Sequence, residues 1–332
     1  MAYKIEKNYY QGLTKITLTY GGLKASFLNY GARMYQLYIP DRNGQLGNIL
    51  LSYDEPADIL NDPAYFGAVV GPVAGRIKAG LWDNYQLDQN NEANHIHGGR
   101  NGWSFQNWEY QIVEHQASVE VIFSLYDTKS GYPGPIDVLV SYHLNENSLT
   151  MTTSCTTDSR TLVNPTSHSY FNLSGDGQGD ILEHQLQIKA KEILAVDQAK
   201  IPTGKILLVK GTPYDFQQLK PLKKSLDCLP AGIDDTFVLN GELNQPQLYL
   251  YEPTSGRELA VATTAESMVL FSTTGFVEDF KLNGRRMHSN YGLAIEPQLF
   301  PDKVHHPQWG SIELTPGKTF TSQTDYYFSV KK

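Results

Sequence analysis

The chain has 332 residues, of which 35 are acidic and 27 basic, so its formal net charge at neutral pH is −8. A net negative chain with no basic run interleaved with aromatic residues is not expected to bind nucleic acid, because affinity for phosphate backbones depends on clustered Lys and Arg. All-β domains run to roughly 200–250 residues or more as one unit, so the length leaves one large domain or two halves open.

The first residues and the hydropathy of the chain predict a soluble, cytoplasmic protein. Residues 1–7 contain no apolar stretch of signal-peptide length. No window reaches the roughly 18 apolar residues that a membrane helix needs, so we expect no membrane partner. Cys155 and Cys228 are the two cysteines, and without an export signal they are expected to remain free thiols.

Alternation of apolar and polar residues dominates the chain. Ile16, Leu18 and Tyr20 alternate with polar neighbours, and the same period of two recurs over residues 119–125 and 136–144. Helical periodicity is almost absent. These patterns predict half-buried antiparallel strands. Shorter segments of the same kind follow at residues 186–188, 237–239, 248–250, 259–261, 269–271 and 327–330.

Turn residues are expected to separate these strands. Many short strands at such spacing are typical of a sandwich. No repeat of fixed period, low-complexity tract or linker rich in Pro, Gly or Ser interrupts the pattern. We therefore predict an all-β fold, a large antiparallel β-sandwich, that forms a single domain over residues 1–332. The expected turns are Asn43-Gly44, Tyr132-Pro133-Gly134, Pro202-Thr203-Gly204, Ser255-Gly256 and Pro316-Gly317.

The first segment with chemical potential is Asn-His-Ile-His-Gly-Gly at residues 94–99. His97 precedes a glycine pair that lets the backbone approach a ligand closely, and its imidazole suits acid–base chemistry. The alternative is a histidine that caps a turn. In an extended segment His95 shares a face with His97, so a His-x-His metal pair is conceivable. No third and fourth ligands are apparent, so we expect no metal.

His168 is the second candidate. Hydroxyl and amide side chains surround it in the sequence, and such groups can fix the orientation and tautomer of an imidazole that acts as an acid. The alternative is a core histidine that these groups satisfy by hydrogen bonds. The polar neighbours are Thr166, Ser167, Ser169, Tyr170 and Asn172.

Glu296 differs from the other carboxylates because it follows Leu293-Ala294-Ile295 and precedes Pro297. An apolar lead-in predicts partial burial, which raises the pKa of a carboxyl group and can make it a working base. Asp234 and Asp235, in contrast, come just before the predicted strand that ends at residue 239, where they could cap a turn, and surface solvation is the usual fate of such pairs.

Arg76 lies in the Gly-rich stretch 71–80, where its guanidinium could reach a sugar hydroxyl or a carboxylate. The stretch lacks the Gly-Lys-Ser/Thr ending of a phosphate loop, and the chain has no dinucleotide fingerprint, so we expect no cofactor. A Gly-x-Ser-x-Gly elbow for a serine nucleophile is also missing.

In their order and residue identities, these blocks resemble those of the aldose 1-epimerase (galactose mutarotase) family over nearly the whole chain. The resemblance implies a large antiparallel β-sandwich, in agreement with the period-two pattern. The matching blocks are Gly75-Arg76-Ile77, residues 94–99 with Gly102 and Trp108, residues 131–134, 166–173, 196–197, 201–204 and 211–216, residues 232–234 with Phe237, and residues 296–298 with Pro301-Asp302.

The resemblance also implies an activity and a role for each site residue. Glu296 would be the general base on the anomeric hydroxyl of a sugar, and His168 the general acid at the ring oxygen. His97 would lie close to the ring oxygen, while Arg76 and Asp234 would hold sugar hydroxyls. The implied reaction is the interconversion of the α and β anomers of a free aldose, with galactose or glucose as the default substrate and maltose as a further candidate. It requires no metal and no nucleotide.

Four positions depart from the family pattern. Gly75 stands where many members have Asn, and Ser167 where Asn is common. Asp235 stands where His is frequent, which is expected to alter substrate contacts. Leu270 aligns with a Gln that reaches the sugar in many relatives, so one hydrogen bond to the substrate is expected to be missing or supplied elsewhere.

Aromatic residues are abundant, and most should fill strands and core. An aromatic face can also stack on the apolar face of a pyranose. The aromatic residues nearest in sequence to the site segments are Trp103, Trp108, Tyr170 and Phe171.

Three other functions compete with the epimerase. A non-catalytic sugar-binding protein on the same fold would not need a matched acid and base. A glycoside hydrolase could use Asp234 and Glu296, and the separation of their carboxyl groups would identify it. A hexose-6-phosphate epimerase would need several basic residues around the phosphate, and the net negative charge disfavours an anionic ligand.

Overall fold

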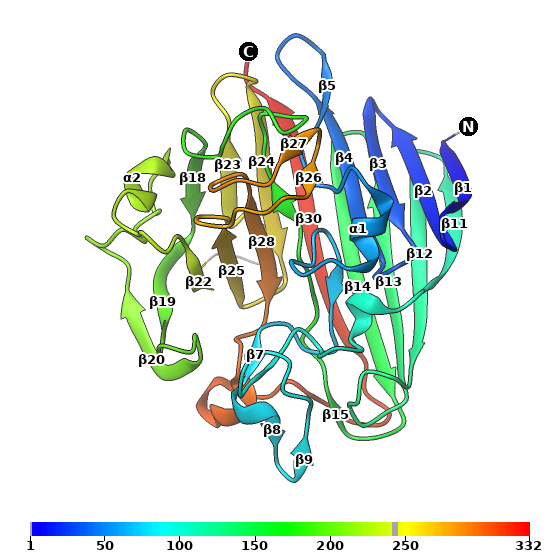
Figure 1. The fold of residues 1–332 in the computed structure, drawn as a ribbon, viewed down its shortest axis with the longest axis vertical. Coiled ribbons are helices and arrows are strands. Elements are labelled where there is room, and N and C mark those ends of the chain that lie inside the picture. Colours follow the sequence, from blue (N-terminus) through cyan, green and yellow to red (C-terminus); the bar gives the residue numbers. More distant parts are fainter. Residues whose placement is uncertain (1, 241–244) are drawn as a thin grey trace.

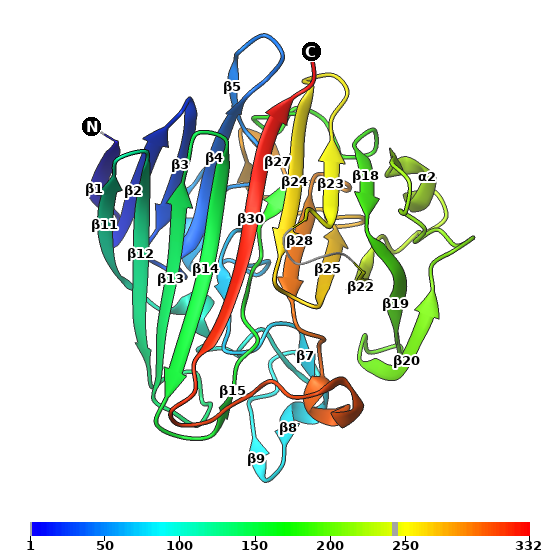
Figure 2. The same cartoon turned by 180° about the vertical axis from the view of Figure 1, so that it is seen from behind.

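The structure is a computed structural model that describes residues 2–240 and 245–332. Two layers of antiparallel strands pack face to face (Figure 1). One layer is a nine-stranded sheet in the order β11-β12-β13-β14-β30-β24-β23-β18-β21, which lies in front in Figure 2. Its strands are β11 (Glu109–His115), β12 (Ser118–Asp127), β13 (Ile136–Leu144), β14 (Ser148–Thr157), β18 (Gln185–Ile188), β21 (Lys220–Pro221), β23 (Leu248–Tyr251), β24 (Arg257–Thr263) and β30 (Phe320–Val330).

The opposite layer contains two sheets side by side. A five-stranded sheet follows chain order from β1 to β5, and a six-stranded sheet has the order β17-β28-β25-β22-β19-β20. The first consists of β1 (Tyr3–Tyr10), β2 (Leu13–Tyr20), β3 (Leu23–Leu28), β4 (Arg33–Pro40) and β5 (Leu46–Asn48). The second consists of β17 (Tyr170–Phe171), β19 (Ala190–Val196), β20 (Pro202–Leu208), β22 (Asp234–Leu239), β25 (Ser267–Ser272) and β28 (Leu293–Gln298).

Short strand pairs and helices complete the described chain. The pairs are β6 (Val69–Val70) with β16 (Thr166–Ser167), β7 (Arg76–Ile77) with β10 (His95–Ile96), β8 (Leu81–Trp82) with β9 (Tyr85–Gln86), β15 (Thr161–Leu162) with β29 (Glu313–Leu314), and β26 (Lys281–Leu282) with β27 (Arg285–Arg286). The helices are α1 (Pro56–Leu60) and α2 (Lys223–Leu226), with short 3₁₀ turns at 78–80, 103–105, 303–305 and 307–309. Within the described ranges, none of the helices has the length and apolar character that a membrane crossing requires.

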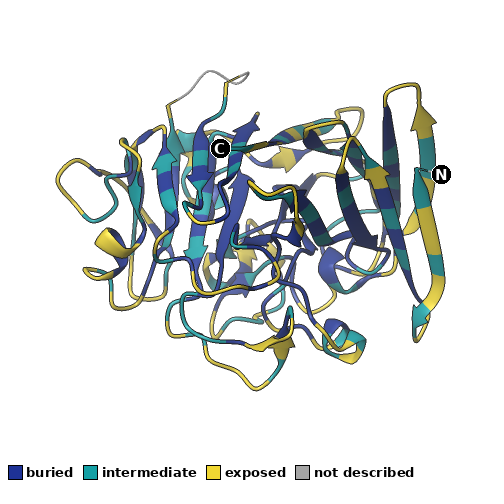
Figure 3. Ribbon diagram, turned by 90° about the horizontal axis from the view of Figure 1, so that it is seen from above, coloured by how far each residue is buried: buried dark blue, intermediate teal, exposed yellow. Residues whose placement is uncertain are grey.

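The main core lies between the two layers, as the buried inner faces in Figure 3 show. Strand β13 illustrates the cause, because Val138, Val140 and Tyr142 are buried while their neighbours in the strand are not. Across the layers, the Phe27 ring of β3 lies 4.6 Å from the Tyr142 ring. Every segment for which the sequence predicted a strand forms one. The predicted all-β sandwich is confirmed.

Four of the five predicted turns lie outside strands, but the one at Pro202-Thr203-Gly204 is wrong. These residues begin β20, which pairs with β19 at the edge of the six-stranded sheet. Pro is tolerated at the start of an edge strand because no ladder hydrogen bond needs its missing N–H. The chain reverses earlier, where the Asp197 N–H donates to the Ile201 carbonyl at 2.9 Å.

Strand β28 is buried along its whole length. Leu293 and Ile295 belong to the core between the layers, whereas Glu296 and Gln298 line a cavity on the other face of the sheet. Burial of both faces explains why an uninterrupted apolar run precedes Glu296.

Candidate active site

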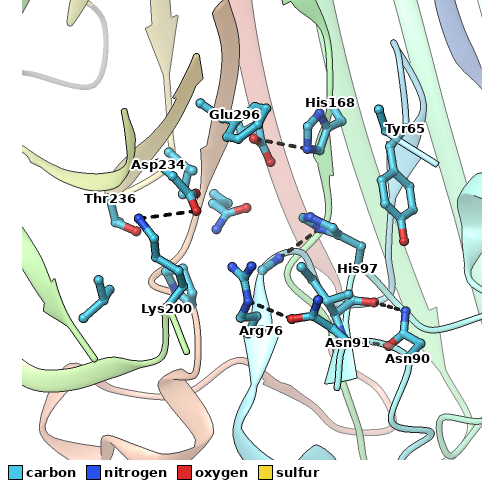
Figure 4. A pocket seen from close by; sticks show the side chains of 18 of the residues that line it. Tyr65, Arg76, Asn90, Asn91, His97, His168, Lys200, Asp234, Thr236 and Glu296 are labelled. Atoms are coloured by element: carbon cyan, nitrogen blue, oxygen red, sulfur yellow. Dashed lines mark hydrogen bonds and ion pairs between the residues drawn. The ribbon is translucent and has the colours of Figure 1, made fainter. Parts of the chain in front are cut away.

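A cavity of about 460 Å³ lies over the six-stranded sheet, on the face opposite the main core. This volume lies within the range typical of small-molecule sites. Strands β22, β25 and β28 form its floor, and the segments around β7, β10 and the β19–β20 hairpin form its walls (Figure 4). The lining includes all five residues that the sequence singled out for the site, namely Arg76, His97, His168, Asp234 and Glu296.

Glu296 lies on the cavity floor, opposite Val269 of the neighbouring strand β25. Its side chain is only 3% exposed. Burial raises the pKa of Glu296 well above its usual value, the negative charge of Asp234 raises it further, and Arg76 acts in the opposite direction. A carboxyl group with a raised pKa is suited to taking and returning a proton at neutral pH.

His168 faces Glu296, with its Nε2 atom 3.4 Å from Oε1 of the carboxyl group (Figure 4). Backbone hydrogen bonds fix the residue, because its N–H donates to Ala68 and its carbonyl accepts from Gly67. The Tyr65 ring stacks against the imidazole at 5.9 Å. Burial lowers the pKa of His168 to about 4, so the ring is neutral at pH 7.

The expected anchoring of the His168 ring by neighbouring hydroxyl groups is wrong. The Ser167 and Ser169 hydroxyls bond each other at 2.8 Å, and the Thr166 hydroxyl donates to a backbone carbonyl. Nδ1 of His168 has no hydrogen-bond partner among the described residues. Aromatic packing against Tyr65 and Tyr170 therefore orients the ring.

His97 follows β10 in a left-handed conformation, with φ of +52°. The Gly75 N–H donates to Nδ1 of His97 at 3.2 Å, so the neutral ring carries its proton on Nε2. Its ring meets that of His168 edge to face at 5.2 Å. Burial, His168 and Arg76 lower the pKa of His97 well below its usual value. His97 is thus a neutral hydrogen-bond donor beside the acid–base pair.

His97 lines the cavity, but His95 does not. The His95 ring is fully buried, and its Nδ1 lies 2.7 Å from the Asp88 carbonyl and 2.8 Å from the Asp88 carboxylate. The Tyr132 hydroxyl contacts its Nε2 at 2.8 Å. Both ring nitrogens are occupied within the protein, so His95 supports the loop and does not form a metal pair with His97.

Arg76 of β7 lies on a wall of the cavity, and Asp234 of β22 lies on its floor. Nε of Arg76 donates to Asn91 at 3.0 Å, which leaves the outer guanidinium nitrogens toward the cavity (Figure 4). Oδ2 of Asp234 lies 3.7 Å from Nζ of Lys200. Arg76 is thus held by a hydrogen bond, whereas Asp234 has a cation nearby.

Several lining residues had no role in the sequence analysis, among them Lys200 and Gln298. Lys200 projects from the β19–β20 hairpin, and Gln298 lies two positions after Glu296 on β28. The alternation along β28 could have identified Gln298, because residues two apart in a strand share a face. Within the described chain its buried amide has no hydrogen-bond partner. No local pattern could have identified Lys200, which lies in a turn.

The expected position of the sugar-facing residue on β25 is wrong by one residue. Leu270 is fully buried in the main core, and Val269 and Phe271 face the cavity instead. Asp235 likewise does not line the cavity. Its carboxylate accepts the Asp234 N–H at 3.0 Å, and the residue is buried. We therefore expect no direct contact between Asp235 and the substrate.

The expected aromatic contacts are also only partly correct. Trp103, Trp108 and Phe171 are core residues. Tyr170 does line the cavity, and its hydroxyl donates to the Ala64 carbonyl at 3.0 Å. The remaining aromatic surface of the cavity comes from Tyr65, Phe271 and Phe276.

The fold and the site together define a β-sandwich protein that places a carboxyl group and an imidazole against each other in a cavity of small-ligand size. A family model described as aldose 1-epimerase matches residues 14–327, and the chain belongs to that family. It is accordingly an isomerase with aldose mutarotase activity.

Similar proteins agree with this assignment. The galactose mutarotase of Bos taurus is 34% identical, with 95% of this chain and 94% of the relative covered. The maltose epimerase of Levilactobacillus brevis is 29% identical, with 97% and 96% covered. Among solved structures, the galactose 1-epimerase of Lactobacillus acidophilus superposes with a TM-score of 0.88 at 28% identity, covering 99% of both chains.

Proposed function

We propose that the protein interconverts the α and β anomers of a free aldose by general acid–base catalysis, with Glu296 as the base and His168 as the acid. The observation that carries this assignment is the 3.4 Å contact between the two side chains in the cavity. The anomeric oxygen and the ring oxygen of a pyranose are bonded to the same carbon. A base for one and an acid for the other must therefore be close neighbours.

The reaction needs one proton to leave and one to arrive. Glu296 takes the proton of the anomeric hydroxyl while the bond between the anomeric carbon and the ring oxygen breaks, and His168 protonates that oxygen. The open-chain aldehyde rotates about the bond between its first two carbons. Ring closure on the other face of the carbonyl returns both protons, so neither residue is changed at the end of the cycle.

Three further residues would bind the substrate. His97, with its proton on Nε2, would donate a hydrogen bond close to the ring oxygen. Arg76 and Asp234 would hold hydroxyl groups on the sugar, because a guanidinium donates and a carboxylate accepts hydrogen bonds. The substrates proposed are galactose and glucose, with the disaccharide maltose as a further candidate. The cavity volume of about 460 Å³ favours a ligand at least as large as a hexose.

The test is polarimetry of freshly dissolved α-galactose, α-glucose and α-maltose, corrected for spontaneous mutarotation. Wild-type protein is expected to shorten the relaxation to the same final rotation. Glu296→Gln keeps the shape of the side chain but removes the base, so kcat should fall by about a hundred- to ten-thousand-fold. Glu114→Gln, an exposed position on β11, is the matched control and should behave as wild type.

The three sugars also rank the substrates, because the same protein sample relaxes each under the same conditions. If the wild-type protein accelerates none of them, the proposed substrates are wrong. If Glu296→Gln keeps full activity, the assignment of the base is wrong.

A further inference from the structure

Lys200 is a charged residue in the cavity for which the acid–base mechanism has no use. It lies in the hairpin between β19 and β20, and its side chain is 38% exposed. Nζ of Lys200 lies 3.7 Å from Oδ2 of Asp234, and Figure 4 shows the side chain extended toward that carboxylate. Val196 and Pro202 of the same hairpin also line the cavity. The hairpin is therefore one wall of the site.

The turn that presents Lys200 is held by hydrogen bonds to a single residue, Asp197. Its carboxylate accepts the N–H groups of Ala199 and Ile201, at 2.9 and 3.0 Å. Its backbone carbonyl accepts the Lys200 N–H at 3.1 Å. A turn fixed in this way positions a side chain before a ligand arrives, so less conformational freedom is lost on binding.

The backbone of Lys200 adopts a conformation that a lysine does not favour. Its φ of +61° lies in the left-handed region, which Gly and Asn occupy more readily. Residues held in such conformations are concentrated at ligand-binding sites. Lys200 therefore occupies this turn although Gly or Asn would fit it with less strain.

Stabilisation of the fold by the contact with Asp234 does not explain why position 200 is a lysine. A separation of 3.7 Å exceeds hydrogen-bond length, and the two side chains are 38% and 28% exposed. Exposed ion pairs of this kind add little to stability. Both groups thus keep hydrogen-bonding capacity toward a ligand. The ammonium can only donate and the carboxylate can only accept, whereas a sugar hydroxyl does both.

We propose that Lys200 is a substrate-binding residue that binds, together with Asp234, the 2-hydroxyl group of the aldose. The hydroxyl donates to the Asp234 carboxylate and accepts from the Lys200 ammonium. The inference rests on the proposed function, in which His168 lies at the ring oxygen and Glu296 at the anomeric oxygen.

The order of the side chains selects the 2-hydroxyl. Along the cavity wall in Figure 4 the sequence is His168, Glu296, Asp234 and then Lys200. Beyond the ring oxygen and the anomeric carbon, the next carbon of a pyranose in that direction is C2. Its hydroxyl therefore lies nearest to the Asp234–Lys200 pair.

The experiment compares equilibrium binding of galactose and 2-deoxygalactose by calorimetry. Lys200→Met removes the charge at similar length, and Lys205→Met, an exposed position on β20, is the matched control. Lys200→Met should weaken galactose binding by about 10- to 100-fold, as expected for loss of a charged hydrogen bond. It should leave the weaker binding of 2-deoxygalactose unchanged, and Lys205→Met should leave both unchanged. Lys200→Arg should recover part of the affinity, because it restores a cation.

Two outcomes would overturn the proposal. Unchanged affinity for galactose in Lys200→Met would show that the ammonium does not contact the sugar. An equal loss for galactose and 2-deoxygalactose would show that Lys200 acts elsewhere on the substrate. Polarimetry of the wild-type protein separates these results from a failure of the proposed function, because calorimetry reports binding whether or not the protein interconverts the anomers.

Discussion

Burial moves the pKa values of Glu296 and His168 in opposite directions. It raises the first well above the usual value for a carboxyl group and lowers the second to about 4. At a pH between the two pKa values, Glu296 and His168 together hold one proton. One proton is also what the mechanism needs, because neutral Glu296 with neutral His168 and ionised Glu296 with protonated His168 differ only in where that proton lies.

The pH dependence of kcat/KM follows from this proton count. Below about pH 4 both His168 and Glu296 carry a proton, so the base is blocked and activity is low. Activity should rise as pH increases through about 4, remain level while the pair holds one proton, and fall through the raised pKa of Glu296. Polarimetric rates over a pH series, with buffer catalysis subtracted, measure the profile.

The fall in activity at high pH, the alkaline limb of the profile, is assigned to Glu296, and this assignment has its own control. In Glu296→Gln the carboxyl group no longer titrates, so the residual activity should lose that limb. A limb that persists in the variant would belong to another group, and the proton count proposed for the pair would be wrong.

At the scale of elements, the turn after β10, which carries His97, depends on the glycine at position 98. Gly98 has φ of +81°, and a Cβ atom there would lie 1.8 Å from the Gly71 carbonyl oxygen. That oxygen accepts the Trp103 N–H, so it cannot move freely. Gly98 is therefore required by the close approach of two backbone segments. From the sequence we had expected the glycine pair to allow close approach to a ligand.

Gly98→Ala is therefore expected to destabilise the protein by about 2–4 kcal/mol, since overpacking adds to the cost of a left-handed alanine. The matched control is Gly211→Ala, which has φ of +77° but no atom within 4 Å of the added Cβ. It should cost only about 1 kcal/mol. Thermal unfolding of both variants measures the difference.

The activity of Gly98→Ala is expected to fall as well, because displacement of the Gly71–Gly98 contact moves His97. Equal stability of the two alanine variants would show that the backbone contact is not what requires glycine at position 98.

At the scale of the whole molecule, the core between the layers extends far from the active-site cavity. Phe27 of the five-stranded sheet packs against Tyr142 and Phe123 of the nine-stranded sheet, with ring centroids 4.6 and 6.5 Å apart. None of the three lines the cavity. Their contribution is to the packing of the two layers.

Phe27→Ala is expected to lower the free energy of unfolding by about 3–5 kcal/mol, as for other large core truncations. Activity per folded molecule should remain near that of wild type. Urea unfolding and polarimetry on the same sample measure both. Tyr126→Ala, at a position that is 61% exposed, is the control and should change stability by less than about 0.5 kcal/mol. A large loss of activity in folded Phe27→Ala would contradict this separation.

The sequence by itself predicted nine of the strands, the sandwich and the five residues that meet in the cavity. Alternating polarity is a local property, and the apolar run before Glu296 marks a strand buried on both faces. The tertiary structure decided which face of each strand meets the cavity and which distant segments contact each other there, because local patterns do not contain this information. The pairing of β25 with β28 turned Val269, and not Leu270, toward the site, because a shift of one residue exchanges the faces of a strand. Lys200 reaches Asp234 only because β19 lies beside β22 in the six-stranded sheet, a contact that depends on packing between segments distant in the chain.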